Sequence, residues 1–137
     1  MNNPALLNCL KSYSHMTDEQ LYNALQYGTG PTIVVRDING GDYSGTYRAG
    51  YFNAKESGII NLDIKCVLDY ENGVGFDDQS FSFFISTVLL HESVHYGNTL
   101  NGFAEGRYEY GFGWETCAYG MNIDDVRSAQ IYLQKKQ

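Results

Sequence analysis

The sequence predicts an α+β fold, and three observations support this class. Helical patterns stand at both ends of the chain, a β-branched stretch divided by glycines lies between them, and a long apolar run begins near Asp78. Strands gathered in one part of a chain and helices in others are typical of α+β rather than of alternating α/β domains. A chain of 137 residues buries about two-thirds of its surface on folding, which is enough for one core. We therefore expect a single domain over residues 1–137.

Two helices are predicted at the N-terminal end. Residues 4–10 start with a proline, which suits a first helical turn, and carry leucines at helical spacing. Thr17 and Gln20 form a capping-box pattern, which predicts a second helix that ends at Gly28. His15 stands at the end of the first helix, where we expect a surface or capping residue.

Three segments predict a small sheet of three to four strands. Residues 32–36 are β-branched and end at a glycine-rich turn, and residues 58–63 form another short apolar strand. Residues 46–52 are rich in tyrosine and alternate loosely, which is typical of an edge strand. The stretch 64–70 either extends the last strand or forms a loop.

The longest predicted element is a buried helix that runs from Asp78 to about Tyr96. Its apolar residues point in nearly every direction, which indicates a helix surrounded by protein. Residues 98–113 contain four glycines and no clear period, so we expect a long loop of functional importance. A helix over residues 114–119 and a final helix, capped by residues 122–125, complete the prediction.

Composition excludes several classes of protein. The formal net charge is −7 and no basic run occurs, which disfavours nucleic-acid binding. No segment reaches the roughly 18 apolar residues of a membrane span, and the first residues lack a signal-peptide pattern. We expect a soluble monomer. Cys9, Cys66 and Cys117 form no CxxC pair, so we expect buried thiols, with a bridge from Cys9 to Cys66 left open.

Residues 91–95 form an HExxH motif on the buried helix. Histidines four positions apart lie on one helical face, so His91 and His95 can bind one ion. Zinc takes histidine nitrogen at about 2.0–2.1 Å, and three protein ligands leave a position for water. Glu92 is placed to accept a proton from that water, which is the role of a general base. These residue types are costly inside an apolar helix unless they are paired or bound to metal.

The third zinc ligand is open on sequence grounds. Glu115 follows His95 with nineteen residues between them and opens a predicted helix. That separation resembles the gluzincin metallopeptidases, thermolysin-like enzymes in which a glutamate from a second helix completes the site. Glu105 and Glu109 are closer but lie in the predicted loop, and Asn101 stands where the metzincin pattern has a ligand. We expect Glu115 ahead of these three.

The sequence also leaves open which residues orient the histidines and which polarise the reacting carbonyl. Thermolysin-like enzymes carry an aspartate one turn after the glutamate ligand, and this chain has Tyr119 there. Tyr119 is a candidate for orienting a histidine or polarising the carbonyl, with core packing as the plainer interpretation. Tyr108 and Tyr110 compete for the oxyanion-stabilising role.

Several short motifs together carry a family resemblance: Asn3-Pro4 opening a cysteine-containing helix, the string 91–98, Asn101-Gly102, Glu105-Gly106, Trp114-Glu115 and Tyr119-Gly120. With these, the chain resembles the small zincin-type metallopeptidase toxin domains at the C-termini of bacterial polymorphic and secretion-system toxins. The resemblance implies a minimal zincin-like fold and a Zn²⁺ metalloendopeptidase, secreted or injected into a target cell. It also implies a protein or peptide substrate and a cognate immunity protein that protects the producer.

Two other functions remain open at this point. One is a catalytically silent zinc-binding interaction module that keeps the fold, since a chain this short has little room for subsites. The other is a zinc hydrolase of a non-peptide amide or of peptidoglycan crosslinks. For the peptidase, we expect extended substrate to pair with the edge strand at residues 47–52, in a cleft between the sheet with the HExxH helix and the C-terminal helices.

Overall fold

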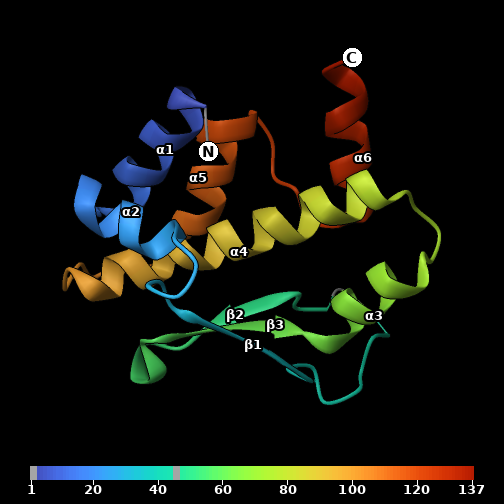
Figure 1. The fold of residues 1–137 in the computed structure, drawn as a ribbon, viewed down its shortest axis with the longest axis horizontal. Coiled ribbons are helices and arrows are strands. Elements are labelled where there is room, and N and C mark those ends of the chain that lie inside the picture. Colours follow the sequence, from blue (N-terminus) through green and yellow to red (C-terminus); the bar gives the residue numbers. More distant parts are fainter. Residues whose placement is uncertain (1–2, 45–46) are drawn as a thin grey trace.

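One long helix, α4 (Asp78–Leu100), runs through the middle of the structure, and the other elements pack around it (Figure 1). The computed structural model describes residues 3–44 and 47–137. In the view of Figure 1 the sheet lies on one side of α4, and α1 (Pro4–Ser14), α5 (Tyr110–Tyr119) and α6 (Val126–Lys135) lie on the other. The predicted α+β fold, a minimal zincin-like arrangement around the HExxH helix, is confirmed.

Two further helices flank this arrangement, α2 (Asp18–Leu25) and α3 (Ile64–Asn72), and a 3-10 turn spans Ala54–Glu56. The predicted capping box at α2 is present: Thr17 Oγ1 accepts the backbone N–H of Gln20, and Gln20 Oε1 accepts the backbone N–H of Thr17. Asp125 caps α6 by accepting the N–H of Ser128 at 2.7 Å. Helix α2 ends at Leu25, three residues before the end predicted at Gly28.

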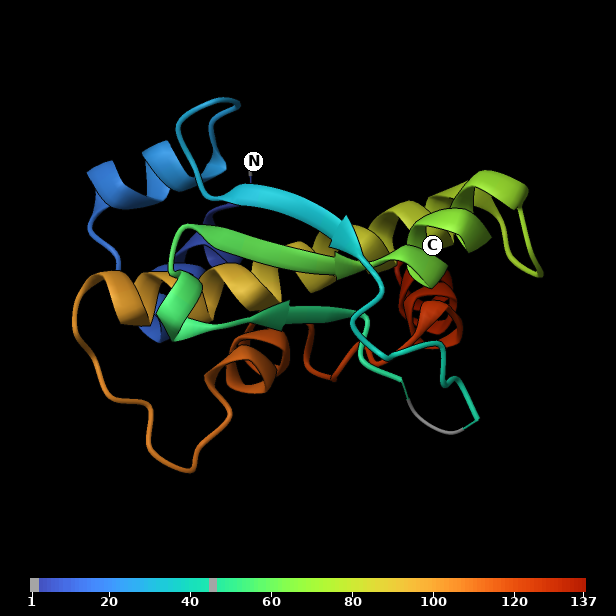
Figure 2. The ribbon, with the colours of Figure 1, turned by 90° about the horizontal axis from the view of Figure 1, so that it is seen from below.

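The sheet has three strands, β1 (Thr32–Arg36), β2 (Gly50–Phe52) and β3 (Ile59–Asp63). Strand β3 lies in the centre, as Figure 2 shows, with β1 parallel and β2 antiparallel to it. Strand β2 is shorter than the predicted edge strand, whose first residue lies outside the described residues. Its outer edge is free of a strand partner within the described sheet.

Two predicted boundaries change because of side-chain packing. Residues 64–72 form helix α3, since Asp63 caps it by accepting the N–H of Lys65 at 3.0 Å. The glycine-rich loop is only residues 101–109, because α5 starts at Tyr110 in spite of its glycines. Gly111 and Gly113 stand where the helix touches its neighbours closely. A Cβ at Gly111 would overlap the ring of His91.

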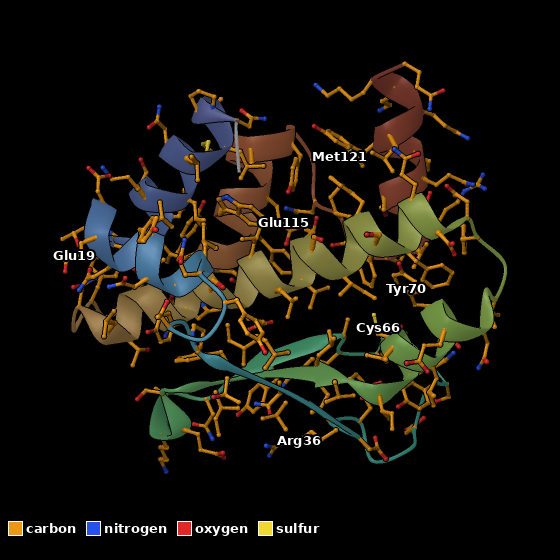
Figure 3. The ribbon with its side chains drawn as sticks, viewed as in Figure 1. Glu19, Arg36, Cys66, Tyr70, Glu115 and Met121 are labelled. Atoms are coloured by element: carbon orange, nitrogen blue, oxygen red, sulfur yellow. A yellow bond between two sulfur atoms is a disulfide. The ribbon has the colours of Figure 1, made fainter. Side chains whose placement is uncertain are left out.

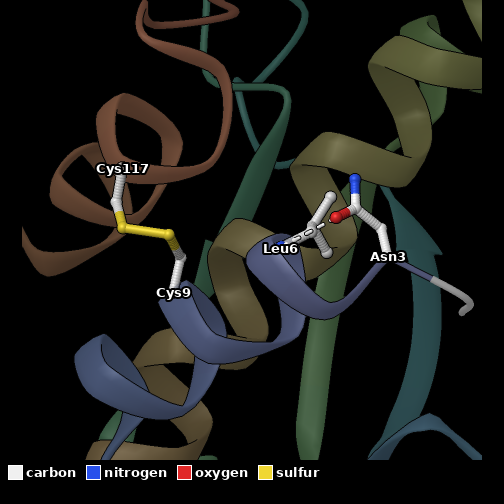
Figure 4. The surroundings of a disulfide bond; sticks show 4 residues. All are labelled: Asn3, Leu6, Cys9 and Cys117. Carbon is white, nitrogen blue, oxygen red and sulfur yellow. Dashed lines mark hydrogen bonds between the residues drawn. A yellow bond between two sulfur atoms is a disulfide. The ribbon is translucent and has the colours of Figure 1, made fainter.

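A disulfide joins Cys9 of α1 to Cys117 of α5 (Figure 4), with the two Cα atoms 5.8 Å apart. The expectation of three free thiols, with a bridge only from Cys9 to Cys66, is therefore wrong. The reason is that α1 packs directly on α5, on the same side of α4. Cys66 lies on α3, where Figure 3 labels it, and is buried and free.

The core consists of two apolar clusters along α4, and the HExxH turn lies where they meet. The first cluster gathers residues of α3, α4, α6 and β3, and the second gathers residues of α1, α2 and α5 around Val94 and the fully buried Trp114. Among residues 3–44 and 47–137, no helix combines the length and the apolar character that a membrane crossing needs.

Candidate metal centre

Helix α4 places His91 and His95 side by side at the wall of a cleft of about 1330 Å³. Their ring centroids are 5.2 Å apart, and their side chains are 12% and 17% exposed. The cleft is bounded by β2, α4, the loop 101–109, α5 and the start of α6. It therefore lies between the sheet with the HExxH helix and the C-terminal helices, as the sequence predicts.

Glu109 faces both histidines from the N-cap of α5. Its Oε2 lies 3.2 Å from Nε2 of His91, and its Oε1 lies 3.1 Å from Nε2 of His95. Ligands at about 2.0–2.1 Å around a tetrahedral zinc are separated by about 3.3 Å, so these spacings fit such an ion. Within the described part of the chain, His91, His95 and Glu109 form the one group of three or more histidine, cysteine, aspartate or glutamate side chains that could hold a metal ion.

Glu115 lies on the other side of the His91 ring. Its Oε2 accepts the Nδ1–H of His91 at 2.5 Å, and its Oε1 accepts the backbone N–H of Ile123 at 2.7 Å. Figure 3 labels Glu115 on α5, where it stands toward α4. Both carboxylate oxygens are thus occupied away from the Nε2 atoms. The prediction that Glu115 is the third ligand remains untested, and the geometry favours Glu109.

The alternatives weighed for that role lie elsewhere. Glu105 accepts the Nδ1–H of His95 with both oxygens, at 2.8 and 2.9 Å. Asn101 bonds to Gln20 of α2 and donates to the backbone carbonyls of His15 and Gly97. Each histidine therefore has its own carboxylate at Nδ1, an arrangement that fixes the tautomer and leaves the Nε2 lone pair for an ion.

Glu92 is buried in the same cleft, with 8% of its surface exposed. No hydrogen bond to its carboxylate occurs among the described residues. Strand β2 approaches it closely at Gly50, where an added Cβ would lie 2.5 Å from Val88 and 3.1 Å from Glu92 Oε1. Burial raises the pKa of Glu92, although His91 and His95 oppose that shift. The result is a carboxylate next to the two histidines that has a raised pKa and no hydrogen-bond partner in the part of the chain that the structure describes.

The carboxylates change the pKa of both histidines in the metal-free chain. Burial lowers the pKa of His91, but hydrogen bonds with Glu109 and Glu115 outweigh it and raise the value to about 10. The pKa of His95 is raised in the same way, with Glu105 in place of Glu115. The pKa of Glu109 is lowered despite its burial, by hydrogen bonds from both histidines. A metal ion entering the site would displace these protons.

The three tyrosines proposed for the carbonyl do not line the cleft. Tyr119 packs among aromatic rings, and burial raises its pKa. Tyr108 and Tyr110 stack near Tyr13 on α1. Among the residues that do line the cleft, Tyr47, Arg48 and Tyr51 of the β2 side can donate hydrogen bonds.

Sequence reasoning ranked Glu109 as a loop charge because the following helix was expected to start at Trp114. The signal that it missed is the N-cap position: with α5 starting at Tyr110, Glu109 accepts the N–H of Gly111 at 2.7 Å. A carboxylate there is held by the helix N-terminus and directed at the histidines.

Comparison with known proteins matches the chain to a protein family. No curated protein and no solved structure matches the chain. Residues 1–120 match the family described as metallopeptidase toxin 3. That region contains the whole HExxH motif, the loop after α4 and helix α5. A metallopeptidase works with a metal ion, and His91, His95 and Glu109 can hold one here. The resemblance noted in the sequence is confirmed, and the chain belongs to the metallopeptidase toxin 3 family.

Proposed function

We propose that the chain is a zinc metalloendopeptidase whose ion is held by His91, His95 and Glu109. The observation that carries this proposal is that the two nitrogens of each histidine ring have different carboxylate partners. Both Nδ1 atoms are engaged by other carboxylates, while both Nε2 atoms converge on Glu109. Two imidazoles and one carboxylate are a donor set of catalytic zinc sites, which keep a further position for water or substrate.

The residues around the site have separate roles in the reaction. When bound, the ion lowers the pKa of a water molecule and polarises the scissile carbonyl. Glu92, which has no hydrogen-bond partner among residues 3–44 and 47–137, accepts the proton of the attacking water and passes it to the departing amine nitrogen. Glu115 and Glu105 hold the two imidazoles in the tautomer that binds metal. A pKa raised by burial suits Glu92 to both halves of this proton transfer.

The free edge of β2 offers a place for an extended substrate. Gly50, Tyr51 and Phe52 all line the cleft, and Gly50 lies against Glu92. A peptide added as a strand beside β2 gains backbone hydrogen bonds and runs past the histidines. This geometry favours cleavage within an unfolded or extended segment rather than at a chain end.

The toxin family and the disulfide support a setting outside the producing cell. Disulfides persist in oxidising surroundings and are rare in the reducing cytosol, and Cys9–Cys117 ties α1 to the helix that follows Glu109. We propose that the domain is delivered to a target cell and that an immunity protein shields the producer.

The test combines zinc analysis with a proteolysis assay on a peptide library. Wild type is expected to hold about one equivalent of zinc and to cleave, whereas Glu92→Gln keeps the zinc and loses about 10²–10⁴-fold in rate. Glu56→Gln is the matched control and keeps full activity, because Glu56 is exposed and does not line the cleft.

Two results would contradict the proposal: wild-type proteolysis by Glu92→Gln, or less than about half an equivalent of zinc in wild type. Full zinc occupancy without cleavage of any peptide would favour the silent binding module. Cleavage confined to peptidoglycan fragments would favour the amide hydrolase.

A further inference from the structure

A chain of hydrogen bonds leads from His95 to the end of the N-terminal helix. His95 Nδ1 bonds to Glu105, whose Oε2 also accepts Nδ2–H of Asn98 at 2.7 Å. Asn98 Oδ1 in turn lies 2.7 Å from Nδ1 of His15. The three links connect a proposed metal ligand on α4 with a residue 80 positions earlier in the sequence.

The direction of each bond follows from its partners. Nδ2 of Asn98 faces two oxygens that only accept, Glu105 Oε2 and the backbone carbonyl of Tyr13, the latter at 2.9 Å. The amide orientation is therefore fixed, and its Oδ1 must accept from His15, which carries its proton on Nδ1. Asn98 is only 1% exposed, so water cannot easily replace these bonds.

Glu105 depends on this support because it lies on the loop 101–109, outside any helix or strand. Figure 2 shows that loop extending away from the end of α4. Asn98 holds the loop twice, through Glu105 and through its own carbonyl, which accepts the N–H of Phe103 at 2.8 Å. The ring of Phe103 stacks on the ring of His15, with centroids 3.9 Å apart. His15 thus contacts both the loop and the asparagine that fixes it.

The backbone at His15 is unusual in a way that serves this contact. His15 ends α1 in the left-handed conformation, with φ of 60°, and is the one non-glycine residue with positive φ among residues 3–44 and 47–137. Glycine is the common residue at this position of a helix end. Glycine would lack the ring that stacks on Phe103 and donates to Asn98.

We propose that His15 and Asn98 are positioning residues that hold Glu105 against His95 and thereby set the orientation of a metal ligand. This inference rests on the proposed function, in which His95 binds the ion. Partners that orient a ligand histidine change metal affinity when they are lost, by about 10–100-fold for direct partners. The N-terminal helix, far from the HExxH motif in sequence, then forms part of the support of the metal site.

The experiment measures Co²⁺ binding, because cobalt in place of zinc gives a visible spectrum that reports ligand geometry. Asn98→Ala is compared with Asn101→Ala, a matched control three residues away. Asn101 bonds to the backbone carbonyl of His15 and to Gln20 but not to Glu105. We expect Asn98→Ala to weaken Co²⁺ binding by about tenfold and to shift the visible bands. We expect Asn101→Ala to leave both unchanged.

A second pair of variants tests His15 without straining its backbone. His15→Gly suits the positive φ and removes the ring, and we expect Co²⁺ affinity to fall by roughly threefold. His15→Asn also tolerates that conformation and puts an amide N–H near the position of Nδ1, so we expect it to restore the affinity. This pair decides the matter if Asn98→Ala fails to fold by circular dichroism.

The results separate this inference from the proposed function. If wild type binds no Co²⁺ and no zinc, both are wrong. If wild type binds metal, but the Asn98 and His15 variants match it in affinity and spectrum, the positioning role alone is wrong. An equal loss in Asn101→Ala would also overturn it, because that result would reflect general destabilisation of the α1–α4 contact.

Discussion

Replacing Glu109 or Glu115 by glutamine removes the same charge from two residues of one segment, yet the structure predicts different losses. Glu115 is 2% exposed and accepts two N–H groups, from His91 and from Ile123. Glutamine has a single acceptor oxygen, so one buried donor would be left facing an NH₂ group. Glu109 has a side chain that is 40% exposed, and a glutamine there can still cap the N–H of Gly111.

The magnitudes follow from these contacts. An unsatisfied buried donor costs about 1–3 kcal/mol. For 137 residues the unfolding entropy is about 0.29 kcal/mol/K, so Glu115→Gln should lower the Tm of the metal-free protein by about 3–10 °C. Its zinc affinity should fall by about 10–100-fold, as for loss of a residue that orients a ligand. Glu109→Gln should lower the Tm by less than Glu115→Gln does, because a glutamine at this 40% exposed side chain keeps the cap on Gly111. It should weaken zinc binding by more than about 100-fold.

The assay is a thermal melt of each metal-free variant, followed by zinc titration against a chromophoric chelator. The expected pattern is a crossover: the stability loss belongs to Glu115→Gln and the larger affinity loss to Glu109→Gln. If Glu115→Gln abolishes zinc binding while Glu109→Gln binds as wild type does, the geometric reasoning is refuted. The third ligand would then be Glu115, as its spacing from His95 predicts.

Three further predictions concern the disulfide, the β2 contact and the cleft arginine. The Cys9–Cys117 bond closes a loop with a sequence separation of 108 and contributes about 5 kcal/mol in the chain-entropy model, so reduction should lower the Tm by about 17 °C. An unchanged melt, with two additional free thiols measured, would contradict this. Gly50→Ala would press on Glu92 and should lower kcat by about 100-fold at unchanged zinc content; wild-type kcat would argue against the contact. Arg48 lowers the pKa of Glu92, and the base must be ionised, so Arg48→Gln should move the acidic limb of kcat/KM to higher pH. A profile that does not move would remove Arg48 from the argument.

The parts of the fold that sequence reasoning anticipates correctly depend on residues close together in the chain. The capping box at Thr17 and the cap at Asp125 are each formed within three residues. The HExxH spacing places His91 and His95 on one helical face wherever that helix lies. Such features need no knowledge of what packs against them, which is why pattern and propensity suffice.

The features that sequence reasoning misses depend on contacts between distant segments of the chain. Gly111 disfavours a helix by intrinsic propensity, yet it is needed because α5 lies against the ring of His91. Because the sequence does not reveal that contact, the glycines placed the predicted start of α5 at Trp114 and left Glu109 in a predicted loop. The pairing of Cys9 with Cys117 has the same origin, since it follows from α1 lying on α5.

The Cys9–Cys117 bond also decides the fate of a molecule that has been cut. The HExxH motif and the whole loop 101–109 lie between the two cysteines. A peptide bond broken anywhere in that stretch yields two pieces that remain covalently joined. A peptidase that cleaves its own loop, or is cleaved there by a protease of its host, therefore releases no fragment in an oxidising medium. The pieces can separate only where a reductant opens the bond, so integrity on a gel would depend on whether the sample is reduced.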